Sequence, residues 1–126
     1  MIHPNARLAY DVEVGPFSRI EEHVKIGKGT KVGSSCVIEG RTEIGEDNAI
    51  FTGTVIGSIP QDLKYKKDTK SYTIIGNNNI IREYVTINPG TDEGAKTVIG
   101  NDNELMAYVH IAHDCVLRDH IIIANL

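Results

Sequence analysis

Tryptophan is absent from this 126-residue sequence, cysteine occurs twice, and positive charge is in the minority. Cys36 and Cys115 lie too far apart to form a metal-binding motif of closely spaced cysteines. Thirteen basic and seventeen acidic residues give a formal net charge of -4, so we expect no nucleic-acid partner. No apolar run approaches the roughly 18 residues of a membrane span, and the start lacks a secretory signal pattern. We therefore expect a cytoplasmic protein, and the length favours a single domain.

What the sequence has in abundance is an aliphatic residue at every sixth position, often followed by glycine. A period of six fits neither a helix nor an alternating strand, but it fits short strands joined by tight turns. Hexapeptide repeats of this kind indicate a parallel β-helix. The positions on this frame are Ile2, Leu8, Val14, Ile20, Ile26, Val32, Ile38, Ile44, Ile50, Ile56, Ile75, Ile81, Ile87, Ile99, Leu105, Ile111, Leu117 and Ile123.

The pattern resembles that of the hexapeptide-repeat proteins, which implies an all-β, left-handed parallel β-helix with three hexads per coil. The repeat is interrupted twice, and we expect two loop excursions, at about 57–73 and 88–97, from a single β-helix domain spanning 1–126. With both excursions removed, Ile44, Ile75 and Ile99 fall in one column. The fragments "IGEDN", "IGNNN" and "IGNDN" then become neighbours, and this predicts a ladder of stacked amides made by Asn48, Asn79 and Asn103.

A second column contains Ile56, Ile87 and Ile111, so both excursions are expected to leave one edge of the β-helix. The next coil carries "HIAHDC" at this edge. Because Ile111 faces inward, His110 and His113 are predicted to point outward. Histidine is well suited to act as a general base near neutral pH, and a neighbouring carboxylate would orient its ring. The alternatives are a plain surface turn and zinc ligands shared between subunits.

The first excursion contains "PQDLKY", which could supply three kinds of contact to a sugar and its phosphates. Gln61 offers an amide, Asp62 an acceptor and Lys64 a cation. The alternative is an ordinary solvated loop. The sequence has no phosphate-binding glycine loop and no nucleophile elbow.

The order "QDLKY", "IREYVTINPGT" and "HIAHDC" on a hexad frame resembles the acyl-[acyl-carrier-protein]–UDP-N-acetylglucosamine O-acyltransferases. The resemblance covers essentially the whole chain. It implies a homotrimer that moves a 3-hydroxyacyl group from acyl-carrier-protein to the glucosamine 3-hydroxyl of UDP-N-acetylglucosamine, the first step of lipid A biosynthesis. It implies no cofactor, metal or covalent intermediate. A related N-acyltransferase acting on an amino-sugar nucleotide, or an inactive scaffold, are the alternatives.

The resemblance also implies residue roles, since His113 matches the family's general base and Asp114 its partner. His110 matches a residue that lines the sugar site, and the substrate-binding loop is matched by Gln61, Asp62 and Lys64. Asn88 is assigned to the substrate-binding residues as well, although it stands where relatives often carry histidine. The sequence stops at Leu126 inside a hexad, so the family's further coils and C-terminal helical domain are expected to be missing.

Overall fold

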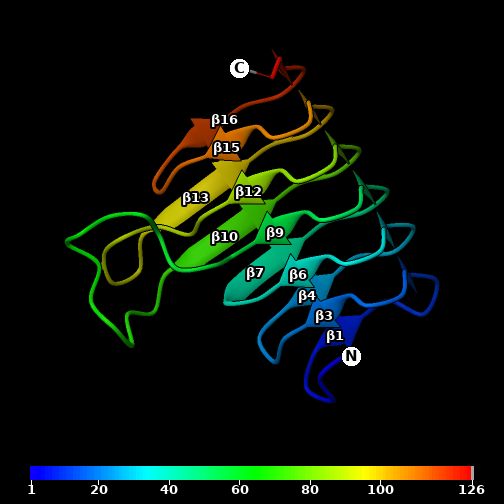
Figure 1. The fold of residues 1–126 in the computed structure, drawn as a ribbon, viewed down its shortest axis with the longest axis horizontal. Coiled ribbons are helices and arrows are strands. Elements are labelled where there is room, and N and C mark those ends of the chain that lie inside the picture. The colour runs from blue at the N-terminus through cyan, green and yellow to red at the C-terminus, as the bar shows by residue number, and fades with distance from the viewer. Residues whose placement is uncertain (126) are drawn as a thin grey trace.

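The computed structural model describes residues 1–125, which form a left-handed parallel β-helix of about six turns without any helix. Figure 1 shows the coils stacked along one axis, with the two ends of the chain at opposite ends of the stack and the main excursion projecting to one side. The fold class predicted from the repeat is confirmed. No helix within residues 1–125 has the length and apolar character needed to cross a membrane.

Three parallel sheets form the walls of the β-helix, and consecutive strands of the chain pass from one wall to the next. The first wall has the order β1-β4-β7-β10-β13-β16, with bounds Arg7–Leu8, Lys25–Ile26, Arg41–Ile44, Tyr72–Ile75, Lys96–Ile99 and Val116–Leu117. The second has the order β17-β14-β11-β8-β5-β2, with bounds Ile122–Ile123, Glu104–Leu105, Ile80–Ile81, Ala49–Ile50, Lys31–Val32 and Glu13–Val14. The third has the order β15-β12-β9-β6-β3, with bounds His110–Ile111, Thr86–Ile87, Val55–Ile56, Val37–Ile38 and Arg19–Ile20.

The aliphatic residue of each hexad is the last residue of its strand and points into the interior. In the central coils this residue is fully or almost fully buried, whereas the strand residue before it is more exposed. Isoleucine and valine suit these positions because β-branched side chains pack well on a pleated surface. The inner faces of the three walls therefore meet in one continuous apolar core.

Strand pairing matches the columns predicted from the sequence. Ile75 pairs with Ile44 on one side and with Ile99 on the other. Ile87 pairs in the same way with Ile56 and Ile111. The strict period thus fixed the register, because a shift of one residue would turn every apolar side chain outward.

The predicted asparagine ladder is present and buried. Asn79 Oδ1 accepts the backbone N–H of Asn103, while the side-chain and backbone N–H groups of Asn79 both donate to Asn48 Oδ1. Each side-chain amide also donates to a backbone carbonyl of the next coil, as Asn79 does to Gly100 at 2.9 Å. The ladder therefore supplies partners for backbone groups inside the turns, where an unpaired group would be costly.

Two strand-free segments interrupt the coils, 57–71 between β9 and β10 and 88–95 between β12 and β13. Gly57 begins the first with φ of 88°, a left-handed conformation that side chains rarely adopt. A Cβ atom there would also collide with the carbonyl oxygen of Glu39. Glycine is thus required where the chain leaves the wall.

Candidate functional site

The candidate site lies at one edge of the β-helix, beside the ends of three neighbouring strands. β9, β12 and β15 are adjacent in the third wall, and each delivers the chain to this edge. The first excursion follows β9, the second follows β12, and the turn that contains His113 follows β15. Segments distant in the sequence therefore meet because their strands are stacked in register.

The imidazole of His113 lies between two carboxylates. Its Nδ1 is 3.1 Å from Oδ2 of Asp114, the next residue, and its Nε2 is 3.8 Å from Oδ2 of Asp62 in the first excursion. The His113 side chain is 35% exposed and that of Asp62 is 19% exposed, so the ring lies at the surface but under the loop. The site thus holds a histidine that is oriented on one side and accessible on the other.

Asp114 is itself held by three contacts. Its backbone N–H donates to Oγ1 of Thr97 at 2.9 Å, and its Oδ1 accepts the backbone N–H of Thr91 at 3.3 Å. Its Oδ2 faces His113. The residue has φ of 64°, a left-handed conformation that aspartate tolerates better than most side chains. The second excursion and the wall therefore jointly fix the carboxylate beside the histidine.

The carboxylate of Asp62 accepts a hydrogen bond from within its own loop. The backbone N–H of Lys64 donates to Asp62 Oδ1 at 3.0 Å, and this hydrogen bond is the main reason that the pKa of Asp62 is lowered. The nearby His113 and Lys64 charges act in the same direction. Asp62 thus stays ionised beside the imidazole throughout the neutral range.

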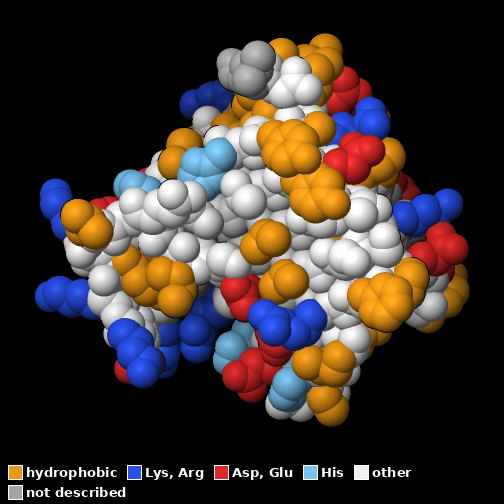
Figure 2. Space-filling model, viewed as in Figure 1, with side chains coloured by type: hydrophobic (Ala, Val, Ile, Leu, Met, Phe, Trp, Pro, Cys, Tyr) orange, Lys and Arg blue, Asp and Glu red, His pale blue; other side chains and the backbone are white. Residues whose placement is uncertain are grey.

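The other residues predicted for the site surround this centre less closely. Gln61 and Lys64 are exposed on the loop, where Figure 2 shows positively charged side chains gathered on the projecting segment, whose basic residues are all lysines. Asn88 is buried; its amide donates to the carbonyl of Ser58 at 3.3 Å, and its Oδ1 has no partner among the described residues. His110 is exposed on β15, with Nδ1 2.7 Å from Oγ1 of Thr86.

Thr91 and Thr97 were not expected at the site from the sequence. Thr97 occupies an inward position on β13, in a column of buried threonines that also contains Thr42 and Thr73. That column was visible in the hexad frame, two residues before the aliphatic position. Thr91 lies in an excursion without periodicity, so no sequence signal would have placed it beside Asp114.

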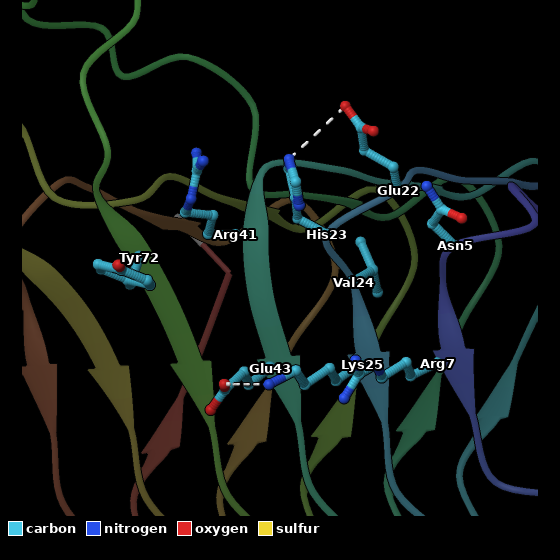
Figure 3. Close-up of a pocket in the computed structure, with 9 residues that line it drawn as sticks. All are labelled: Asn5, Arg7, Glu22, His23, Val24, Lys25, Arg41, Glu43 and Tyr72. Atoms are coloured by element: carbon cyan, nitrogen blue, oxygen red, sulfur yellow. Dashed lines mark hydrogen bonds and ion pairs between the residues drawn. The ribbon is translucent and has the colours of Figure 1, made fainter.

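A second concave region lies elsewhere and has a different character. A pocket of about 380 Å³ lies over the outer face of β1, β4, β7 and β10, and Figure 3 shows the residues that line it. Two pairs of its charged side chains already contact each other, Lys25 with Glu43 at 3.4 Å and His23 with Glu22 at 3.6 Å. None of the predicted site residues lines it. This pocket is therefore separate from the histidine site.

The arrangement at His113 suits proton transfer. A carboxylate only accepts hydrogen bonds, so a hydrogen on Nδ1 directed at Asp114 leaves the lone pair on Nε2 free to take a proton. Within residues 1–125, no group of three or more histidine, cysteine, aspartate or glutamate side chains could hold a metal ion. The geometry is that of a base with an orienting partner.

Known proteins similar to this chain are acyltransferases. No protein-family model matches the chain. Among curated proteins, the acyl-[acyl-carrier-protein]–UDP-N-acetylglucosamine O-acyltransferase of Thermodesulfovibrio yellowstonii is 50% identical over 100% of this chain and 49% of its own length. The corresponding protein of Saccharophagus degradans is 47% identical over 99% of this chain and 48% of its own length.

Solved structures agree with the curated relatives. A crystal structure of a UDP-N-acetylglucosamine acyltransferase superposes with a TM-score of 0.95 at 48% identity, covering 99% of this chain and 48% of that one. The enzyme from Bacteroides fragilis superposes with a TM-score of 0.93 at 46% identity, covering 98% and 48%. The chain spans about half the length of the relatives it matches. Over that half, the chain belongs to the family of the acyl-[acyl-carrier-protein]–UDP-N-acetylglucosamine O-acyltransferases.

Proposed function

We propose that the protein containing this chain transfers a 3-hydroxyacyl group from acyl-carrier-protein to the glucosamine 3-hydroxyl of UDP-N-acetylglucosamine, the first step of lipid A biosynthesis. The observation that carries the proposal is the position of His113 between Asp114 and the loop residue Asp62. The names of the relatives support the choice of acyl donor and acceptor.

The proposed reaction is a direct acyl transfer. Nε2 of His113 takes the proton of the sugar hydroxyl while the hydroxyl oxygen attacks the thioester carbonyl. The carbon–sulfur bond then breaks, and the proton passes from the imidazolium to the departing thiol of the carrier. Asp114 stabilises the imidazolium that forms in between. The steps balance without a cofactor, a metal or a covalent enzyme intermediate.

The remaining residues would bind substrate. Asp62, Gln61 and Lys64 sit on the loop that reaches His113, and they offer an acceptor, an amide and a cation to the sugar nucleotide. Asn88 is buried and its amide donates to the carbonyl of Ser58, so its contribution to substrate binding would be to hold the first excursion in place. His110 would line the same site from β15.

We also propose that the protein is a homotrimer and that it lies in the cytoplasm. A homotrimer would bring residues of a neighbouring subunit to the exposed side of His113, and a cytoplasmic location would give access to both acyl-carrier-protein and UDP-N-acetylglucosamine. Loops on a rigid scaffold are where binding residues concentrate, and both excursions emerge at this one edge.

The test is steady-state acyl transfer by the purified full-length gene product. UDP-N-acetylglucosamine and a UDP-sugar bearing a 3-amine are offered separately with 3-hydroxyacyl-carrier-protein, and the acylated product is measured. Preference for the hydroxyl acceptor supports the proposal. Preference for the amine would make the protein an N-acyltransferase, and transfer to neither acceptor would leave the inactive scaffold as the explanation.

A further inference from the structure

We propose that Thr97, a buried residue that contacts no substrate, is the positioning residue that holds Asp114 and thereby sets which ring nitrogen of His113 carries the hydrogen. The inference rests on the proposed function in that His113 is taken as the base. It assigns a role in the site to the wall of the β-helix itself, in addition to its loops.

The backbone of Asp114 is held against the wall of the β-helix. This residue has φ of 64°, and a left-handed conformation at a residue other than glycine persists only where its surroundings maintain it. Its N–H is directed into the wall and meets Thr97 Oγ1 at 2.9 Å. The hydroxyl therefore anchors the backbone nitrogen of Asp114, and the N–H of Thr91 anchors the carboxylate itself at 3.3 Å.

Thr97 differs from the other two threonines of its column in what its hydroxyl contacts. Thr42, Thr73 and Thr97 occupy the same inward position in successive coils, and all three are fully buried. Thr42 donates to the carbonyl of Glu39 at 2.7 Å, whereas the Thr73 hydroxyl has no partner within residues 1–125. Of the three hydroxyls, that of Thr97 alone accepts a hydrogen bond from a residue of the candidate site.

The position of Asp114 decides which nitrogen of the His113 ring carries the hydrogen. With Asp114 Oδ2 fixed 3.1 Å from Nδ1 of His113, the imidazole keeps its hydrogen on Nδ1, and Nε2 faces the first excursion. If Asp114 moved away, Nδ1 would lose its acceptor and the hydrogen could sit on either nitrogen. A base with the hydrogen on Nε2 cannot accept a proton from the substrate, so turnover should fall while sugar binding is retained.

The experiment compares Thr97→Val with Thr73→Val in the full-length gene product. Both replace a buried hydroxyl by a methyl in the same column, but only the first removes the anchor of Asp114. We expect Thr97→Val to lower kcat about tenfold, the scale of one lost hydrogen bond, with KM within about twofold. Thr73→Val should keep the parent kcat. In ¹⁵N NMR of the His113 ring, Thr97→Val should show mixed tautomers, and Thr73→Val should keep the hydrogen on Nδ1.

A second pair keeps the test decisive if Thr97→Val does not fold. Thr97→Ser and Thr97→Ala both lack the methyl group and differ in the hydroxyl, so the serine variant should keep the tautomer and turnover and the alanine variant should lose them. Equal spectra and equal kcat within either pair would overturn the proposal. The NMR spectra need no substrate. If the gene product transfers no acyl group, the proposed function is refuted, but the spectra still test the role of Thr97.

Discussion

Nε2 of His113 lies 3.8 Å from Oδ2 of Asp62, although Asp62 belongs to the first excursion and His113 to a coil that follows both excursions. The contact joins the loop expected to bind substrate to the residue expected to act as base. Because the opposite nitrogen faces Asp114, the two carboxylates act on different atoms of one ring. Replacing each residue should therefore have a different kinetic effect.

Replacing the base should affect turnover and leave binding nearly unchanged. We expect His113→Ala to lower kcat by roughly 10²–10⁴, the usual contribution of general base catalysis, with a small change in KM. Its side chain is partly exposed, so stability should change little. The matched control is His120→Ala, because His120 also lies near a carboxylate, with Nδ1 3.8 Å from Asp102 Oδ2, but not at this site. If His113→Ala keeps more than about a tenth of the parent kcat, the base is another residue.

Replacing the loop carboxylate should mainly weaken binding. Asp62→Ala removes a charged acceptor, and a hydrogen bond to a charged group contributes roughly 1.5–3 kcal/mol, so KM for the sugar nucleotide should rise about ten- to a hundredfold. Lys64→Ala should change KM in the same direction. Lys67→Ala is the control, since this exposed lysine lies on the same excursion. A fall in kcat with unchanged KM in the Asp62 variant would mean that Asp62 acts in the chemical step instead.

The lowered pKa of Asp62 predicts how the loop responds to acid. A carboxyl whose pKa is lower in the folded protein contributes to stability above its ordinary range, near roughly 3.9, and loses that contribution as the pH falls through its lowered value. We expect the Asp62 carboxyl to titrate below the ordinary range by ¹³C NMR. The protection of the Lys64 amide against exchange, relative to an unstructured amide at the same pH, should fall over the same interval, because its acceptor is lost. Titration at or above the ordinary value would contradict the role of this hydrogen bond.

Periodicity explains which parts of this structure could be predicted. The Ile75 and Ile87 columns followed from the period because each residue in a coil has one register partner in the next. The contact of Asp62 with His113 could not follow, since the excursion has no repeat to fix its path. Cys115 shows a further limit. It occupies the same inward position of the hexad frame as the buried Cys36, but it is only half-buried, because β16 ends its sheet and no described strand lies beyond it.

The asparagine ladder predicts a large loss of stability from a single buried amide. Asn79→Ala removes the acceptor of the Asn103 N–H and the donor to the Gly100 carbonyl in a fully buried position. Each buried polar group left without a partner costs roughly 1–3 kcal/mol, so losing both partners should lower the free energy of unfolding by about 2–6 kcal/mol.

Urea denaturation measures this loss, with Asn77→Ala as the control. Asn77 Oδ1 also accepts a backbone N–H, from Glu46 at 2.7 Å, but the residue is exposed and water can replace its side chain. We expect the control to lose less than about 1 kcal/mol. Equal losses in the two variants would mean that burial of the ladder adds nothing, and the amides would then serve only to close the turns.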